Sequence, residues 1–287
     1  MSPPLPTSLP VPKTHKLYIG GEFPRSESGR SYALTRPGAK RAYAQLCLAS
    51  RKDLRAAVDA ARAAQAGWAA RSAYNRGQIL YRMAEMIEGR ADSWQTLLRS
   101  GLGHSAAQAA RALAATVDAL VYYAGASDKY PQIIGAVNPV AGPHHNFTTP
   151  EALGVVGLVF DDGPDPAASA ARIAAAIAAG NTVVALLPGP AGGLVAEFGE
   201  AFATADLPAG VVNLLSGDAA ELTPQFASHM EIQGLAFLRD EPARRIEVER
   251  AAADNMKRCV ASHGPLLALE RVLDFVEYKT VWHPIGT

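Results

Sequence analysis

From Gly154 onward, short β-branched runs alternate with helical stretches, and this alternation constrains the fold more than any other feature. Strands that are apolar along their whole length and alternate with helices are typical of a parallel sheet covered on both faces. We therefore predict an α/β fold with a Rossmann-like doubly wound parallel sheet. The predicted strands span residues 155–160, 182–187, 211–215, 234–238 and 257–261, and the helices between them span 166–179, 193–206, 221–229 and 241–254.

The first half of the chain predicts helices and a small β element. Ser50 and Asp53 have the spacing of a helix N-cap with an acidic residue three positions later, and apolar residues follow at helical spacing up to Trp68. A second helix carries Ile79, Leu80, Met83 and Ile87, and a third extends from about 104 to 128. Residues 16–23 and 31–35 have β-prone patterns around a Gly-Gly turn, so we expect a small antiparallel element there.

Charge and cysteine content narrow the classes of partner and the compartment. The 287 residues hold 27 lysines and arginines against 27 aspartates and glutamates, so nothing in the net charge favours nucleic acid or an anionic membrane. Cys47 and Cys259 are too few for a disulfide framework and lack metal-ligand spacing, which fits a reducing compartment. The proline-rich start does not have the pattern of a signal peptide, so we expect a cytoplasmic protein.

Four segments of the α/β region resemble the aldehyde dehydrogenase superfamily: residues 154–157, 178–184, 207–213 and 255–258. Two upstream segments, 17–23 and 63–68, are also similar to that family. The resemblance implies the nucleotide-binding part of an NAD(P)-dependent dehydrogenase, without the domain that carries the nucleophilic cysteine. We divide the chain into an extended arm (1–15), an N-terminal helical part of the nucleotide-binding-like domain (16–129), an oligomerisation arm (130–150), a Rossmann-like core (151–264) and a C-terminal docking helix and strand (265–287).

Several positions differ from what the family resemblance implies. Gly163 stands where the family has an asparagine that polarises the substrate carbonyl, and a glycine offers no such donor. Leu186 and Gly189 stand where the family has a lysine and a glutamate that hold the cofactor ribose. Ser262 stands at the position of the family's general-base glutamate. We therefore expect no catalytic residue, no metal site and no bound cofactor, and no turnover by this chain alone.

Arg239 and the pair Asp161 and Asp162 are the charged candidates near the predicted ligand edge of the sheet. The loop at Arg239 replaces the family's small pyrophosphate-approaching residues, and Pro242 removes a backbone donor. Arg239 could meet a phosphate, but the carboxylates that follow it favour a surface salt bridge. Asp161 and Asp162 would repel a phosphate, and we interpret them as a solvated turn in which Asp165 caps the next helix.

Two other candidates favour structural roles. Cys259 lies within a predicted strand, which favours a buried structural thiol over a nucleophile. His144 and His145 are adjacent in sequence without other nearby ligands, a pattern that seldom binds a metal.

Two segments resemble the protruding parts through which the family assembles. The tail resembles the strand that, in the family, pairs with a neighbouring subunit, and residues 130–150 resemble the family's other arm. Exposed β segments usually need a partner strand, although the tail could instead fold back on this chain's own sheet. The residues that we assign to oligomerisation are Val137, Val140, Phe147, Val276, Tyr278, Thr280 and Trp282.

Three hypotheses of function follow. The leading one is a non-catalytic subunit that pairs with a full-length aldehyde dehydrogenase or with itself as a homo-oligomer. The second is an NAD(P)-dependent aldehyde oxidoreductase component whose active site a partner completes, and NAD(P) would then be its cofactor. The third is a regulatory module that binds a nucleotide or metabolite in the crevice near Asp161 and Arg239.

Overall fold

The computed structural model describes residues 13–261 and 264–286. Its centre is a five-stranded parallel sheet in the order β10-β9-β6-β7-β8, which confirms the predicted fold class. Chain order runs outward from β6 through β7 to β8, and then continues on the other side of β6 with β9. The sheet therefore has a topological switch point between β6 and β9. The strands are β6 Val155–Val159, β7 Thr182–Pro188, β8 Val212–Gly217, β9 Gly234–Phe237 and β10 Arg258–Val260.

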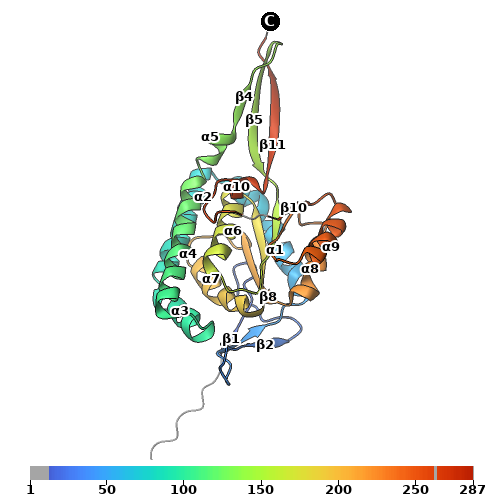
Figure 1. The fold of residues 1–287 in the computed structure, drawn as a ribbon. Coiled ribbons are helices and arrows are strands. Elements are labelled where there is room, and N and C mark those ends of the chain that lie inside the picture. The colour runs from blue at the N-terminus through green and yellow to red at the C-terminus, as the bar shows by residue number, and fades with distance from the viewer. Residues whose placement is uncertain (1–12, 262–263, 287) are drawn as a thin grey trace, which may run out of the picture.

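Helices cover both faces of this sheet, which is why β6, β7, β8 and β9 are buried at every residue (Figure 1). In β6, Val156 and Leu158 pack on one helical layer, while Val155 and Val159 pack on the other. The first layer contains α2 Ala73–Glu88, α4 Ala106–Ala126, α6 Pro166–Ala178 and α7 Leu194–Ala203. The second contains α1 Arg51–Ala69, α8 Ala219–Ser228 and α9 Pro242–Ala253.

The cap predicted for the first helix is present. Ser50 accepts the Asp53 backbone N–H at 3.3 Å, and the Asp53 carboxylate accepts the Ser50 N–H at 2.7 Å. This reciprocal pairing satisfies backbone donors that the first turn of a helix otherwise leaves unbonded. Between α2 and α4 the chain forms α3 Ala91–Thr96 and a π-helical turn, Leu97–Gly101, which the sequence pattern did not predict.

The predicted antiparallel element is only partly correct. β2 Ser31–Leu34 pairs antiparallel with β3 Ala44–Cys47, and β1 Lys13–His15 pairs with β3 in parallel. Residues 16–23 form no strand of this sheet, but Ile19 and Glu22 exchange two backbone hydrogen bonds of 3.0 Å around the predicted Gly-Gly turn. Tyr18 also exchanges backbone hydrogen bonds with Leu214 of β8, at 3.0 and 2.7 Å. The non-local pairing with β8 therefore exists beside the local turn, and the sequence predicted only the turn.

A second three-stranded sheet projects from the body as a narrow arm (Figure 1). It consists of β4 Ala136–Asn138, β5 His144–Ala152 and β11 Val276–Pro284, in the order β11-β5-β4. β11 pairs antiparallel with β5 over all nine of its residues. The tail therefore folds back on this chain's own arm, at an edge. The short helices α5 Tyr130–Ile134 and α10 Glu270–Leu273 precede β4 and β11 respectively.

Asn181 joins the arm to the sheet. Its side-chain oxygen accepts the Gly154 N–H at 2.9 Å, and its amide donates to the carbonyls of Ala176 at 3.0 Å and Phe275 at 2.9 Å. The side chain is fully buried, so these groups have no access to water as an alternative partner. One residue thus fixes the start of β6, the end of α6 and the start of β11. Within the described ranges, no helix is long and apolar enough to span a membrane.

Replacement of Asn181 by alanine should destabilise the fold. Asn181→Ala leaves one buried donor and two buried acceptors without this partner, so we expect a loss of at least about 2 kcal/mol in the free energy of unfolding. Urea denaturation at 25 °C measures it. Gln78→Ala, which removes an exposed amide on α2, should change stability by less than about 0.5 kcal/mol. Equal effects of the two variants would contradict the assigned role of Asn181.

Lys257 should make the free energy of unfolding change with pH in the alkaline range. Its ammonium donates to the carbonyls of His229, at 2.8 Å, and Ile232, and burial lowers its pKa to about 8. The unfolded lysine, with its ordinary pKa of 10.5, binds more protons than the folded one between these values, so stability rises with pH there. Relative to Lys257→Met, the wild type should gain stability between pH 7.5 and 9.5, with a slope of at most about 1.4 kcal/mol per pH unit. If the free energies of unfolding of wild type and Lys257→Met changed in parallel over this pH range, the assigned effect of Lys257 would be refuted.

Candidate functional site

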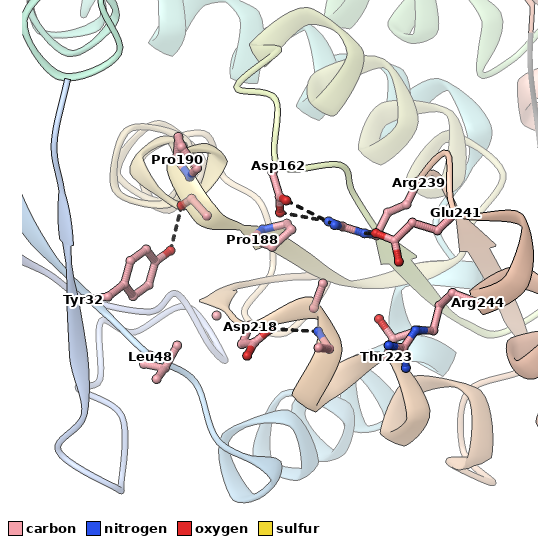
Figure 2. Close-up of a pocket in the computed structure, with 14 residues that line it drawn as sticks. Tyr32, Leu48, Asp162, Pro188, Pro190, Asp218, Thr223, Arg239, Glu241 and Arg244 are labelled. Carbon is pink, nitrogen blue, oxygen red and sulfur yellow. Dashed lines mark hydrogen bonds and ion pairs between the residues drawn. The ribbon is translucent and has the colours of Figure 1, made fainter. Parts of the chain in front are cut away.

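A crevice of about 380 Å³ opens at the carboxyl ends of the central strands, where doubly wound sheets bind ligands (Figure 2). This volume is at the small end of the range for ligand pockets. The ends of β7 and β8 form its floor, α8 and α9 form one wall, and the segment around β2 and β3 forms the other. Its lining residues are Tyr32, Leu48, Asp162, Pro188, Gly189, Pro190, Gly217, Asp218, Ala219, Ala220, Thr223, Arg239, Glu241 and Arg244.

Small residues shape the end of β7 so that Tyr32 can reach it. Gly189 has φ +54°, in the left-handed region that a glycine adopts without strain. Its carbonyl accepts the Tyr32 hydroxyl at 2.9 Å. A side chain at Gly192 would place its Cβ 2.3 Å from that hydroxyl, so glycine is required there. Burial, followed by the charge of Asp162, raises the pKa of Tyr32, which keeps the hydroxyl a hydrogen-bond donor.

The amino terminus of α8 faces the crevice, and its cap is acidic. Asp218 accepts the Ala220 N–H at 2.8 Å. The lining holds three carboxylates, of Asp162, Asp218 and Glu241, against the two guanidinium groups of Arg239 and Arg244. In this arrangement the crevice carries a small excess of negative charge.

Arg239 is the centre of the charge network (Figure 2). Its Nη1 donates to Asp162 Oδ1 at 2.9 Å and its Nη2 to Asp162 Oδ2 at 3.2 Å. Nη1 also donates to the Phe160 carbonyl at 3.2 Å, and Nε donates to Glu241 Oε1 at 2.6 Å. The hydrogen bond to Asp162, more than that to Glu241, raises the pKa of Arg239 against the opposing effect of burial.

These contacts correct two interpretations made from the sequence. Arg239 is not a surface residue, because its side chain is only 10% exposed. Its pairing with Glu241 fits the predicted local salt bridge, but the bidentate contact to Asp162 joins residues 77 positions apart. Asp162 is therefore an ion-pair partner and not simply part of a solvated turn. Asp161 accepts the Asp162 N–H, and Asp165 caps α6 through Ala168, as expected.

The four positions that differ from the family pattern do not form one site in the structure. Gly163 lies on the exposed turn after β6, where a Cβ would meet no atom within 4 Å. The Leu186 side chain is fully buried in the core, and Gly189 lines the crevice. Ser262 lies outside the described residues.

The other candidates lie on strands: Cys259 on β10, and His144 and His145 on β5. Cys259, in β10, is half-buried, and burial raises the pKa of its thiol. Residues 13–261 and 264–286 contain no group of three or more histidine, cysteine or acidic side chains that could hold a metal ion.

The sequence did not predict that Tyr32, Thr223 and Arg244 line the crevice. Tyr32 comes from β2, 157 residues before Gly189, whose carbonyl it bonds. Thr223 and Arg244 lie on helices whose predicted ranges were nearly correct, but helical periodicity alone does not say which turn faces a ligand. The signals for a charged site were Arg239, which two carboxylates follow directly, and the pair Asp161 and Asp162.

The residues assigned to oligomerisation gather on the arm with one exception. Val137, Phe147 and Val281 lie directly opposite one another across the three strands and so share one face of the sheet. Tyr278, Thr280 and Trp282 share the other face. Val140 follows β4 and is half-buried. Val276 is fully buried at the base, so its side chain packs on this chain's own core and is not available to a partner.

Comparison with known proteins identifies the relatives. The family model described as "Aldehyde dehydrogenase family" matches residues 23–266. The chain is 32% identical over 267 residues to the cytosolic aldehyde dehydrogenase 1 of Elephantulus edwardii, covering 89% of this chain and 52% of that protein. It is also 32% identical over 266 residues to retinal dehydrogenase 2 of Gallus gallus, covering 91% of this chain and 51% of that protein. The chain thus spans about half the length of these curated relatives.

Solved structures overturn one expectation. The NAD⁺ complex of an aldehyde dehydrogenase from Bacillus cereus matches with a TM-score of 0.79 and 28% identity, over 86% of this chain and 50% of that one. PnpE from Pseudomonas sp. WBC-3 in complex with nicotinamide adenine dinucleotide matches with a TM-score of 0.78 and 27% identity, over 85% and 50%. The prediction that no cofactor is to be expected is therefore wrong, because relatives that share this fold are dinucleotide complexes. By the extent of the family match, this chain belongs to the aldehyde dehydrogenase family.

Proposed function

We propose that this chain is an assembly subunit of the aldehyde dehydrogenase family, which pairs through its β-sheet arm with a full-length aldehyde dehydrogenase or with a second copy of itself. The observation that carries the proposal is the open edge of the arm. β11 is an edge strand, eight of its nine residues are exposed, and its outer backbone groups have no strand partner in the described part of the chain. An edge of this length is a template for pairing with another chain.

Exposed apolar side chains on the arm support the same proposal. The exposed Val137 and Val281 flank the half-buried Phe147 in a continuous row across the sheet, and Tyr278 and Trp282 are exposed on the opposite face. Aromatic side chains of this kind are enriched in protein interfaces. Lys279 forms an exposed ion pair with Glu151 on the neighbouring strand.

The chain's own chemistry is limited by the residues at the crevice. Gly163 provides no side-chain donor for a substrate carbonyl, and the described residues bring no cysteine to the crevice. We therefore infer that the subunit does not oxidise aldehydes by itself. A second candidate function is favoured by the crevice and by the dinucleotide complexes of the relatives: a component that binds NAD(P) and whose active site a partner completes.

Both functions include NAD(P) as the expected ligand of the crevice. The crevice lies at the carboxyl ends of the strands and includes Asp162 and Arg239 at the switch point, which is the usual place for a nucleotide in this type of sheet. The residues present fit this ligand in part, since the Gly189 backbone and the α8 terminus are accessible, whereas the side chain of Asp162 lies across the approach to Arg239.

A charged residue on the arm should weaken assembly. A partner that covers the row of Val137, Phe147 and Val281 would bury the charge that Val281→Lys introduces. The apparent dissociation constant of the assembly should therefore rise at least about tenfold. Analytical ultracentrifugation of the chain alone, and of the chain mixed with a full-length aldehyde dehydrogenase from the same organism, measures this. Ile246→Lys on α9 is the matched control, because Ile246 is 50% and Val281 42% exposed.

The assembly proposal fails under one clear result. A wild-type chain that stays monomeric at about 100 µM and binds no full-length aldehyde dehydrogenase would overturn it.

NAD or NADP should stabilise the protein through the crevice. At a free concentration one hundred times the dissociation constant, bound ligand raises the free energy of unfolding by about 2.7 kcal/mol, which a thermal shift detects. Ala220→Trp, on the exposed crevice side of α8, should abolish the shift by filling the pocket. Ala63→Trp, on the exposed face of α1, should leave it unchanged. A shift that survives in Ala220→Trp would place the ligand elsewhere.

A further inference from the structure

The ion pair between Asp162 and Arg239 spans the topological switch point of the sheet. Asp162 follows β6 and Arg239 follows β9, and these two strands lie side by side although the chain runs away from β6 in opposite directions. Their side chains meet in a bidentate contact, with N–O distances of 2.9 and 3.2 Å (Figure 2). The switch point is where doubly wound sheets receive the phosphates of a nucleotide. The ion pair therefore occupies the place of a ligand group.

The geometry of the contact suits a phosphate as well as a carboxylate. A guanidinium group presents two parallel N–H donors, and this fork matches the paired oxygens of either anion. Arg239 is only 9% exposed as a residue, yet it lines the crevice, so its fork is a desolvated donor at the crevice wall. The Asp162 carboxylate holds the position that a phosphate ester would take.

The two partners differ in how firmly they are held. Arg239 is anchored by its Nε to Glu241 and by Nη1 to the Phe160 carbonyl, so it keeps its position when Asp162 leaves. The side chain of Asp162 is 56% exposed and lies on a turn beside Gly163, around which there is open space. Rotation of Asp162 toward solvent thus disturbs little packing. The pair consists of a fixed receptor and a displaceable anion.

We propose that Arg239 is the phosphate-binding residue of the crevice and that Asp162 is a built-in competitor that a phosphate ester must displace. The proposal rests on the nucleotide-binding role proposed above and defines its regulation. The ligand class is a nucleotide with an exposed phosphate or pyrophosphate, as in NAD(P). Asp162 lowers affinity in two ways, because it occupies the fork and because its negative charge repels the incoming phosphate.

Removal of the competitor tests the proposal. Asp162→Asn keeps the shape of the side chain but removes its charge, so binding of NAD, ADP and inorganic pyrophosphate should strengthen about tenfold or more over wild type by calorimetric titration. Adenosine, which carries no phosphate, should bind both proteins equally. Asp161→Asn is the matched control: it makes the same change one residue away, at a carboxylate that contacts the Asp162 N–H and not Arg239. Arg239→Met should abolish the gain when combined with Asp162→Asn.

The outcomes separate this proposal from the function on which it rests. Nucleotides that bind wild type and Asp162→Asn equally, or that gain as much from Asp161→Asn, would overturn the competitor and leave the nucleotide site intact. Tighter binding of pyrophosphate to Asp162→Asn without binding of NAD, NADP or ADP would support the phosphate receptor and refute the nucleotide role. If pyrophosphate and all nucleotides fail to bind Asp162→Asn, and its melting temperature shows it folded, both proposals are wrong.

Discussion

Burial of both faces of the parallel sheet is the constraint on which the rest of the structure depends. A parallel pair needs a crossover long enough to return the chain, and the helices that make these returns exclude water from the strands. Val155 and Val156, adjacent in β6, pack on opposite helical layers. Because every strand then points the same way, their carboxyl ends converge on one edge, and the crevice forms there whatever residues line it.

Within that crevice, the chain places opposite charges at the switch point of the sheet. Asp162 and Arg239 satisfy one another across the switch point, and Glu241 fixes the guanidinium. The result is a crevice at the carboxyl ends of parallel strands in which the guanidinium group of Arg239 is already paired. The arm is a separate structure, joined to the sheet by the buried Asn181, so the arm and the crevice lie at different ends of β6.

The sequence predicted most of the α/β region because each local pattern agreed with the tertiary environment. The run predicted at 155–160 is Val155–Val159 in the structure, and the helix predicted at 166–179 is Pro166–Ala178. Prediction failed where a distant segment decided the outcome. Ile19 and Glu22 pair around the predicted Gly-Gly turn, but the sequence did not show that Tyr18 pairs with Leu214, nearly two hundred residues away. The partner of Arg239 was missed for the same reason, since the sequence shows only its neighbours Asp240 and Glu241.

By itself, the sequence determined the fold class, the order of the strands and helices along the chain, the caps at Ser50 and Asp165, and the family resemblance. All of these depend on interactions between residues close in sequence, or on patterns that a buried strand or helix requires. Only the tertiary structure decided that Asp162 faces Arg239, that Tyr32 closes the crevice over Gly189, and that β11 pairs with β5 and leaves an open edge. These contacts join segments 77 to more than 120 residues apart, and no local preference encodes which of the available polar groups will meet once the sheet has closed.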